Sequence, residues 1–276
     1  MKTNPSVKFL SILILLALYS DYCKTQTIDH GTTIVVVRTK DRIIIGADSK
    51  GISVPMDRKE YFNDFSKAPS YEKEKLKKFG NVVVGAAGFY AYPNTRSYPK
   101  SDYDVYITIE TIGSASDDIL KLKEMFKVTI KQAIENGWEF IRSDYPRSDL
   151  SGFSLDLILC GFKKGTPFMF SYTFRPGTDK HPVSDPTLSN VFYPSAVIDS
   201  LHFPIAKAPF DTVYRQVFND RIPKVAFSSI DKLAFSDPID YVRKAILKAI
   251  ELDSVSGGPI KILSITRNGI KAIPER

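Results

Sequence analysis

The sequence predicts an α+β fold, a four-layer αββα sandwich in which two antiparallel sheets lie between helical layers. Short runs of β-branched residues are joined by polar turns, as in hairpins. Two longer segments carry apolar residues at helical spacing. Several strands are apolar without interruption and therefore need cover on both faces. Because no linker or internal repeat separates these elements, we expect one folded domain over residues 32–276.

The first predicted hairpin has strands at 32–37 and 42–47, with the turn at 38–41. A third apolar strand is expected at 81–88. Residues 89–104 are rich in Tyr, Pro and Ser, which predicts a long loop.

An amphipathic helix is expected between Asp117 and Gly137, because acidic residues precede it and an Asn-Gly pair ends it. A second hairpin is predicted from strands 155–162 and 166–174, which flank Lys163-Lys164-Gly165. The apolar face of the helix would consist of Ile119, Leu122, Phe126, Ile130 and Ala133.

Two further helices and a last hairpin are expected in the C-terminal part. Residues 208–220 can form a short amphipathic helix. Ser236 is expected to cap the helix "DPIDYVRKAILKAIELD", with Pro238 in its first turn. The strands "PIKILSIT" and "IKAI" would pair around Asn268-Gly269. The apolar face of the longer helix would consist of Ile239, Val242, Ile246 and Ile250.

The composition is that of a globular protein with a real core: 43% of the 276 residues are hydrophobic and 25% charged. The net charge is +7, but basic and acidic residues are interleaved, which favours a solvated surface over nucleic-acid binding. No metal or organic cofactor is expected, because His30, His181 and His202 lack ligand spacing.

The N-terminus resembles a secretion signal. Lys2 and Lys8 precede an apolar run from Phe9 to Tyr19 that is too short to span a bilayer comfortably. We therefore expect residues 1–31 to comprise a signal peptide and a short pro-segment. The mature protein would be exported, to a periplasm, an envelope or the medium, with no stable membrane span after the leader is removed.

The sequence holds two cysteines, Cys23 and Cys160. A lipoprotein signal ending at Cys23 is the weaker alternative, because small residues do not precede that cysteine. If Cys23 leaves with the leader, no intramolecular disulfide can form. Cys160 would then be inert packing within an apolar strand.

The Gly31–Thr32 bond is a candidate processing site. A threonine hydroxyl is a weak nucleophile that needs a nearby base. At a free chain end the α-amine, with a pKa of roughly 7.7–8.0, is close enough to serve, directly or through one water. Gly31 gives the bond before Thr32 the freedom to bend toward the attacking hydroxyl.

Five short motifs follow one another in the order of a known family. They are "GTT" at 31–33, Asp48 in "GADSKG", Lys75 in "KLKKF", "VGAAG" ending at Gly88, and "DSVSGG" at 253–258. This pattern resembles mature proteasome β subunits and the related bacterial ATP-dependent threonine peptidase, which are N-terminal-nucleophile hydrolases. The resemblance covers the leader to Gly88 and residues from about 237 to the end.

The resemblance implies a role for each matched residue. Thr32 would be the nucleophile and, through its freed amine, the base. Lys75 would favour the alkoxide as an ammonium, and Asp48 would keep Lys75 charged and oriented. The catalytic set implied is Thr32, Asp48, Lys75, Gly88, Asp253 and Ser256.

The remaining members of that set would support the reaction. The N–H of Gly88 would face the developing oxyanion. Asp253 and Ser256 would orient the Thr32 amine. Thr33 is expected to be a strand residue rather than a reserve nucleophile.

Two departures from the family pattern bear on function. The family's Gly-Ser-Gly-like stretch, whose serine helps to position the terminal amine, is missing; Ser195 and Ser200 lie in a different context. After Gly88 the family continues into a helix, whereas this chain has the 89–104 segment.

Three functions are therefore open. The first is a self-processing threonine peptidase, possible as a homo-oligomer, that cleaves peptides or unfolded segments. The second is an N-terminal-nucleophile amidohydrolase that acts on small amides. The third is a non-catalytic scaffold of the same fold.

Overall fold

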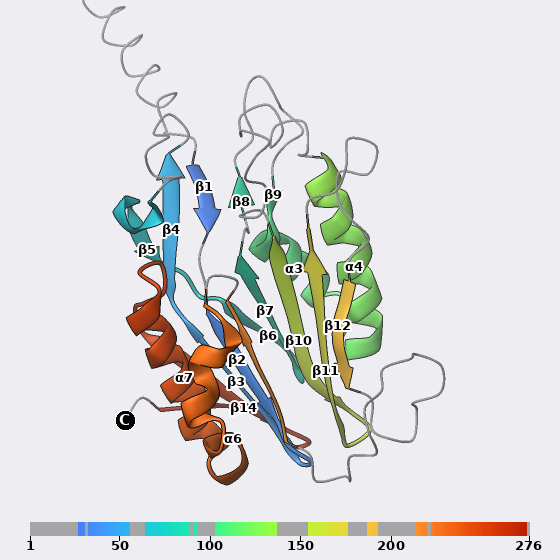
Figure 1. The fold of residues 1–276 in the computed structure, drawn as a ribbon. Coiled ribbons are helices and arrows are strands. Elements are labelled where there is room, and N and C mark those ends of the chain that lie inside the picture. The colour runs from blue at the N-terminus through green and yellow to red at the C-terminus, as the bar shows by residue number, and fades with distance from the viewer. Residues whose placement is uncertain are drawn as a thin grey trace, which may run out of the picture.

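The computed structural model describes residues 27–30, 33–55, 64–88, 91–92, 103–136, 154–175, 187–192, 213–219 and 222–274. These residues form an α+β protein with three antiparallel five-stranded sheets and helices on the outer faces (Figure 1). The α+β class and the antiparallel pairing expected from the sequence are confirmed.

The first of these sheets, sheet B, contains both hairpins that were expected near the chain ends. β2 pairs with β3, and β14 pairs with both β3 and β15. β15 begins at Gly269 with φ +120°, a conformation that favours glycine. Its strand order is β13 (Tyr214–Phe218), β2 (Ile34–Arg38), β3 (Arg42–Asp48), β14 (Ile260–Thr266) and β15 (Gly269–Ile273).

Sheet C contains the expected central hairpin, in which β10 pairs along its whole length with β11. The third apolar strand, β7, pairs on the other side of β10. Its strand order is β12 (Thr187–Phe192), β11 (Thr166–Phe174), β10 (Leu155–Lys163), β7 (Val82–Gly88) and β6 (Leu76–Phe79).

Sheet A is built around the segment that precedes the first hairpin. β1 pairs with β4 from Thr27↔Pro55 to His30↔Ile52, and with β8 at Asp29↔Ala91. β1 therefore has a partner on each side. The strand order is β5 (Ser70–Glu72), β4 (Lys50–Pro55), β1 (Thr27–His30), β8 (Ala91–Tyr92) and β9 (Tyr103–Asp104), and the short helix η1 (Phe65–Lys67) precedes β5.

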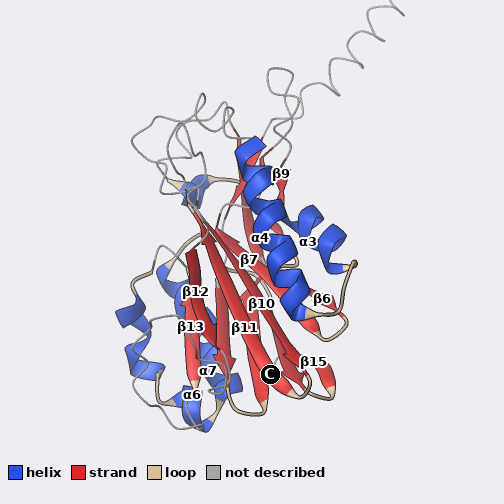
Figure 2. Ribbon diagram, turned by 90° about the vertical axis from the view of Figure 1, so that its right-hand side faces the viewer, coloured by secondary structure: helices blue, strands red, loops and turns tan. Residues whose placement is uncertain are grey.

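The helices lie on the two outer faces. α3 (Val105–Gly113) and α4 (Ile119–Asn136) pack on sheet C, as Figure 2 shows from the side of α4. α7 (Pro238–Leu252) packs on β2, β3 and β14 of sheet B (Figure 1). The short helices η4 (Lys224–Ile230) and α6 (Leu233–Ser236) precede α7 on the same side.

Three apolar clusters fill the space between these elements: one between sheets B and C, and one beneath the helices on each outer face. Along β2, Ile34 and Val36 face sheet C, whereas Val35 and Val37 face α7. This period of two explains why the strand is apolar throughout: both of its faces are buried. Cys160 lies between the sheets at 0% exposure, and burial raises the pKa of its thiol.

Three expectations about the elements were wrong. The segment 208–220, expected as a helix, contains the strand β13 instead. A short apolar run fits both the helical and the strand period, and pairing with β2 makes this one a strand. Asp237, not Ser236, caps α7, and its carboxylate accepts from the backbone N–H of Asp240 at 3.0 Å. The long loop at 89–104 includes β8 and β9.

The helix faces were largely as expected. In α4, Ile119, Leu122, Phe126 and Ile130 are buried. The helix α3 was not expected, because its first residues are β-branched and aromatic. In α7, Val242 and Ile246 are buried, and Ile239 and Ile250 are partly buried beside them.

The expected signal peptide and the residues Gly31 and Thr32 lie outside the described residues, as do Cys23, Ser195 and Ser200. Among the helices that are described, none has the length and apolar character needed to cross a membrane.

Candidate active site

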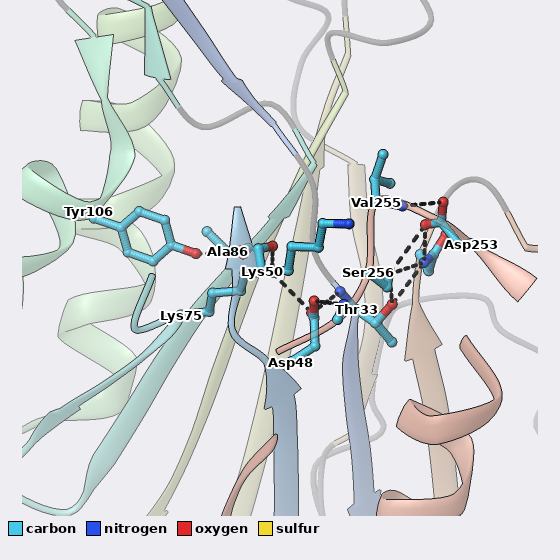
Figure 3. Close-up of polar contacts among 11 residues, drawn as sticks. Thr33, Asp48, Lys50, Lys75, Ala86, Tyr106, Asp253, Val255 and Ser256 are labelled. Atoms are coloured by element: carbon cyan, nitrogen blue, oxygen red, sulfur yellow. Dashed lines mark hydrogen bonds and ion pairs between the residues drawn. The ribbon is translucent and has the colours of Figure 1, made fainter. Parts of the chain in front are cut away.

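Asp48 lies at the centre of a buried polar cluster where β3 ends (Figure 3). Its Oδ1 accepts from the backbone N–H of Thr33 at 2.7 Å and from Lys75 Nζ at 3.0 Å. Its Oδ2 accepts from the N–H of Gly257 at 2.8 Å. A carboxylate that accepts three such bonds inside a protein is held in one orientation.

Lys75 reaches Asp48 from the sheet on the other side of the core. It directly precedes β6, and its side chain is 0% exposed. Nζ donates to Asp48 Oδ1 and to the carbonyl oxygen of Lys50, the latter at 2.5 Å. Burial lowers the pKa of Lys75 to about 8, and the charge and hydrogen bond of Asp48 oppose this shift. Lys75 can therefore gain or lose a proton near neutral pH.

Asp253 and Ser256 form the second half of the site. Asp253 follows the last residue of α7, and its Oδ1 accepts from the N–H of Val255 at 3.2 Å. Ser256 Oγ donates to Asp253 Oδ2 at 3.2 Å and lies 2.8 Å from Thr33 Oγ1. Thr33 thus joins the two halves, with its backbone on Asp48 and its hydroxyl on Ser256.

Asn219, which the sequence analysis did not identify, also belongs to the site. It directly follows β13, and its Nδ2 lies 2.8 Å from Thr33 Oγ1. The same nitrogen lies 3.1 Å from Asp253 Oδ2 and 3.4 Å from Ser256 Oγ. We call the following set the polar network: Thr33, Asp48, Lys75, Asn219, Asp253, Ser256 and Gly257.

The loop after α7 is fixed to the junction of β3 and β4. The carbonyl of Gly257 accepts from the N–H groups of Ser49 and Lys50, at 3.1 and 2.8 Å. Lys50 Nζ donates to the carbonyl of Ser254 at 2.6 Å. Gly258 has φ +73°, and a Cβ there would lie 2.5 Å from Ser49 Oγ. The second glycine of "SGG", Gly258, therefore permits the close approach of this loop to the end of β3.

Gly88 ends β7 with φ +99°. A Cβ at this position would lie 2.3 Å from the carbonyl oxygen of Ser154, so only glycine fits. Tyr106 of α3 donates to the carbonyl of Ala86 at 2.9 Å and thereby fixes the end of β7 (Figure 3). Within the described part of the chain, no hydrogen bond joins Gly88 to the polar network.

Of the six residues named from the sequence, the structure therefore brings four into one network: Asp48, Lys75, Asp253 and Ser256. Thr33, expected only as a strand residue, directly precedes β2 and is fully buried within this network. In the sequence, Asn219 is the polar residue that directly follows the run "TVYRQVF". It was missed because that run was interpreted as a helix rather than a strand.

The described residues contain no group of three or more His, Cys, Asp or Glu side chains arranged to hold a metal ion. Neither a scan against protein-family models nor a search of curated proteins found a match to this chain.

Proposed function

We propose that this protein is an N-terminal-nucleophile hydrolase of proteasome β type, a threonine peptidase that releases its own nucleophile by cleaving the Gly31–Thr32 bond. One observation carries the proposal. The buried Asp48–Lys75 pair is hydrogen-bonded to the backbone nitrogen of Thr33. That nitrogen is bonded directly to the carbonyl carbon of Thr32, so the ion pair is anchored to the residue that directly follows the proposed nucleophile.

The layering of the elements supports the same proposal at the level of the fold. One apolar cluster lies between sheets B and C, and two others lie beneath the helices on the outer faces. This arrangement fits the αββα sandwich of N-terminal-nucleophile hydrolases. Both strands that bracket the site, β2 and β3, belong to sheet B, whereas Lys75 comes from the sheet C side.

Lys75 has a donor left for the nucleophile. An ammonium has three N–H groups, and within the described residues Asp48 and Lys50 accept two of them. The third would donate to the Thr32 hydroxyl and stabilise the alkoxide as the α-amine of Thr32 takes its proton. The lowered pKa of Lys75 suits this role, because the proton is held less firmly than in an exposed lysine.

The reaction would then proceed in two steps. The Thr32 oxygen attacks the substrate carbonyl, the protonated α-amine returns its proton to the leaving amine, and an ester on Thr32 remains. Water, deprotonated by the same amine, hydrolyses the ester and restores the hydroxyl. The N–H of Gly88 is the proposed donor to the oxyanion in both steps, and removal of such a donor lowers rates by about 10²–10³ in other enzymes.

An extended peptide is the substrate class that the geometry favours. β1 ends at His30, directly before Gly31, and is paired as a strand with β4 and β8. A substrate peptide that takes the place of β1 could form the same backbone hydrogen bonds in extended form, whatever its sequence. A small amide has too few backbone groups to form them. With an exported location, we propose peptides or unfolded segments as substrates.

The test is the N-terminus of the exported protein, read by sequencing and intact mass. We expect it to begin at Thr32. Thr32→Ala should keep the short pro-segment before position 32, while the signal peptide is still removed, and should abolish peptide cleavage. Thr39→Ala, at a partly exposed threonine of the first hairpin turn, should do neither.

Other results would select the alternatives. Hydrolysis of N-acyl amides with no cleavage of a peptide library would indicate a small-amide hydrolase. An intact Gly31–Thr32 bond, together with a Thr32→Ala variant that loses no function, would indicate the non-catalytic scaffold.

A further inference from the structure

We infer that Asn219 is a positioning residue of the proposed active site, which sets the direction of the hydroxyl hydrogen bonds beside the nucleophile. The catalytic role rests on the proposed function, whereas the structural role is argued from three contacts of the Asn219 Nδ2 atom alone. They are those from Nδ2 to Thr33 Oγ1, to Asp253 Oδ2 and to Ser256 Oγ.

The chemistry of the partners fixes which end of the Asn219 amide faces the site. A carboxylate only accepts hydrogen bonds, so the NH₂ group and not the carbonyl oxygen must face Asp253. The NH₂ group has two hydrogens. The two shorter contacts, 2.8 Å to Thr33 and 3.1 Å to Asp253, take them, and Ser256 at 3.4 Å is the weakest acceptor.

A direction follows for the whole chain of hydroxyls. Thr33 Oγ1 accepts from Asn219, so its single hydrogen is available for Ser256 Oγ, 2.8 Å away. Ser256 in turn donates its hydrogen to Asp253 Oδ2. The Thr33 hydroxyl therefore donates to Ser256 and the Ser256 hydroxyl to Asp253, and the oxygen of Thr33 is an acceptor on the side of Asn219.

Strand register places Asn219 where it can do this. β13 pairs with β2 and ends at Phe218↔Ile34, and Phe218 is 2% exposed in the core between the sheets. The next residue on each strand, Asn219 and Thr33, therefore leaves the sheet at the same level. The apolar anchor at Phe218 holds the amide beside Thr33.

The link to catalysis runs through Thr33. Its N–H is held by Asp48 and its hydroxyl by Asn219 and Ser256, so the residue is fixed at both ends. Adjacent Cα atoms are about 3.8 Å apart, so fixing Thr33 restricts where the new chain end can lie. Loss of the Asn219 donor would free the Thr33 hydroxyl and loosen the geometry of the chain end.

The decisive variant is Asn219→Asp, which keeps the shape and removes both donors. It also places a second carboxyl beside Asp253, and repulsion between like charges raises the pKa of the introduced acid. We expect kcat for peptide cleavage to fall at least about tenfold at pH 8, with KM changed less than about threefold. When the introduced acid is protonated it can donate one bond, so the ratio of variant to parent kcat should rise as the pH falls.

Two further variants complete the comparison. Asn219→Ala should show the loss in kcat without the recovery at low pH. Asn268→Asp makes the same change in the exposed turn before β15 and should leave kcat and its pH profile as in the parent. The inference is overturned if Asn219→Asp keeps kcat within twofold, or if kcat and KM change together in proportion to a fall in Tm.

A measurement without catalysis separates the two proposals. In Thr32→Ala protein, a double-mutant cycle of Asn219→Ala with Thr33→Val should show non-additive losses in unfolding free energy, because both changes remove the same hydrogen bond. Additive losses overturn the inference about Asn219. If the losses are non-additive but activity does not require Thr32, the hydrogen bond between Asn219 and Thr33 is supported. The proposed function, and with it the catalytic role of Asn219, is then overturned.

Discussion

Two Asp–Lys pairs in this protein have nearly the same geometry and different surroundings. Asp48 and Lys75 lie 3.0 Å apart with both side chains 0% exposed. Asp118, at the start of α4, and Lys163, at the end of β10, lie 2.7 Å apart, but their side chains are 39% and 32% exposed. The buried pair is the longer of the two, so distance does not explain how they differ in chemistry.

Solvent explains the difference. For Asp118, the hydrogen bond from Lys163 is the largest influence and lowers the pKa of the carboxyl. For Lys75, loss of water is the largest influence and lowers the pKa to about 8 in spite of Asp48. The hydrogen bond from the partner dominates at the surface, whereas desolvation dominates in the core. Only the second situation gives a lysine that exchanges its proton near neutral pH.

The largest expected effect comes from breaking the buried pair. Asp48→Asn removes the hydrogen-bonded counter-charge of the buried Lys75 ammonium and should lower the free energy of unfolding by about 3–5 kcal/mol. It should also stop cleavage at Gly31–Thr32. Asp118→Asn breaks the exposed pair and should lower the free energy of unfolding by at most about 1 kcal/mol. Chemical denaturation of both variants measures the contrast.

A double variant sharpens this test. Asp48→Asn with Lys75→Met removes both charges, so it should be more stable than Asp48→Asn alone while remaining unprocessed. Equal losses in the single and double variants would mean that the buried charge is not what destabilises Asp48→Asn.

A smaller effect is expected from pH. The pKa of Lys75 is about 8 in the folded protein and close to the ordinary 10.5 in the unfolded chain. Between these values the unfolded chain binds a proton that the folded protein has released, so the folded protein gains stability as the pH rises. Relative to Lys75→Met, the parent should gain up to about 3 kcal/mol in unfolding free energy from pH 8 to 10.5. A difference that stays flat with pH would mean that burial does not shift this lysine.

The smallest expected effect is that of salt. Raising the ionic strength from about 0.1 M to about 1 M shortens the Debye length from about 10 Å to about 3 Å. The stability difference between parent and Asp118→Asn should therefore shrink, by less than about 1 kcal/mol. The difference for Asp48→Asn should not change, since no solvent reaches that pair. Unfolding midpoints at the two salt concentrations give both values, and equal sensitivity to salt would contradict the contrast.

Much of the site could be predicted because its residues stand at element ends that local patterns mark. Asp48 ends an apolar strand, and Asp253 and Ser256 lie between an amphipathic helix and a strand, so their neighbours fix where they fall. Lys75 is different. Nothing in "EKEKLKKF" distinguishes one lysine of four, and only the family resemblance selected the one that the fold buries.

The parts that could not be predicted depend on contacts between distant segments. Residues 214–218 are a strand because β2 offers them an open edge, and Asn219 reaches Thr33 across 186 positions of sequence. The helix α3 was missed because Val105, Tyr106 and Ile107 favour strands locally, whereas the Asp104 cap and packing on sheet C make them helical. No local pattern encodes either outcome.

The position of β1 has a consequence for maturation. Its backbone is paired with β4 on one side and β8 on the other, and these bonds do not depend on the Gly31–Thr32 linkage. A cut at that linkage would leave the severed leader seated in the sheet. Self-cleavage, which is independent of protein concentration, and escape of the fragment would then have separate rates. A preparation in which mass spectrometry shows complete cleavage would then stay inactive until dilution lets the fragment dissociate.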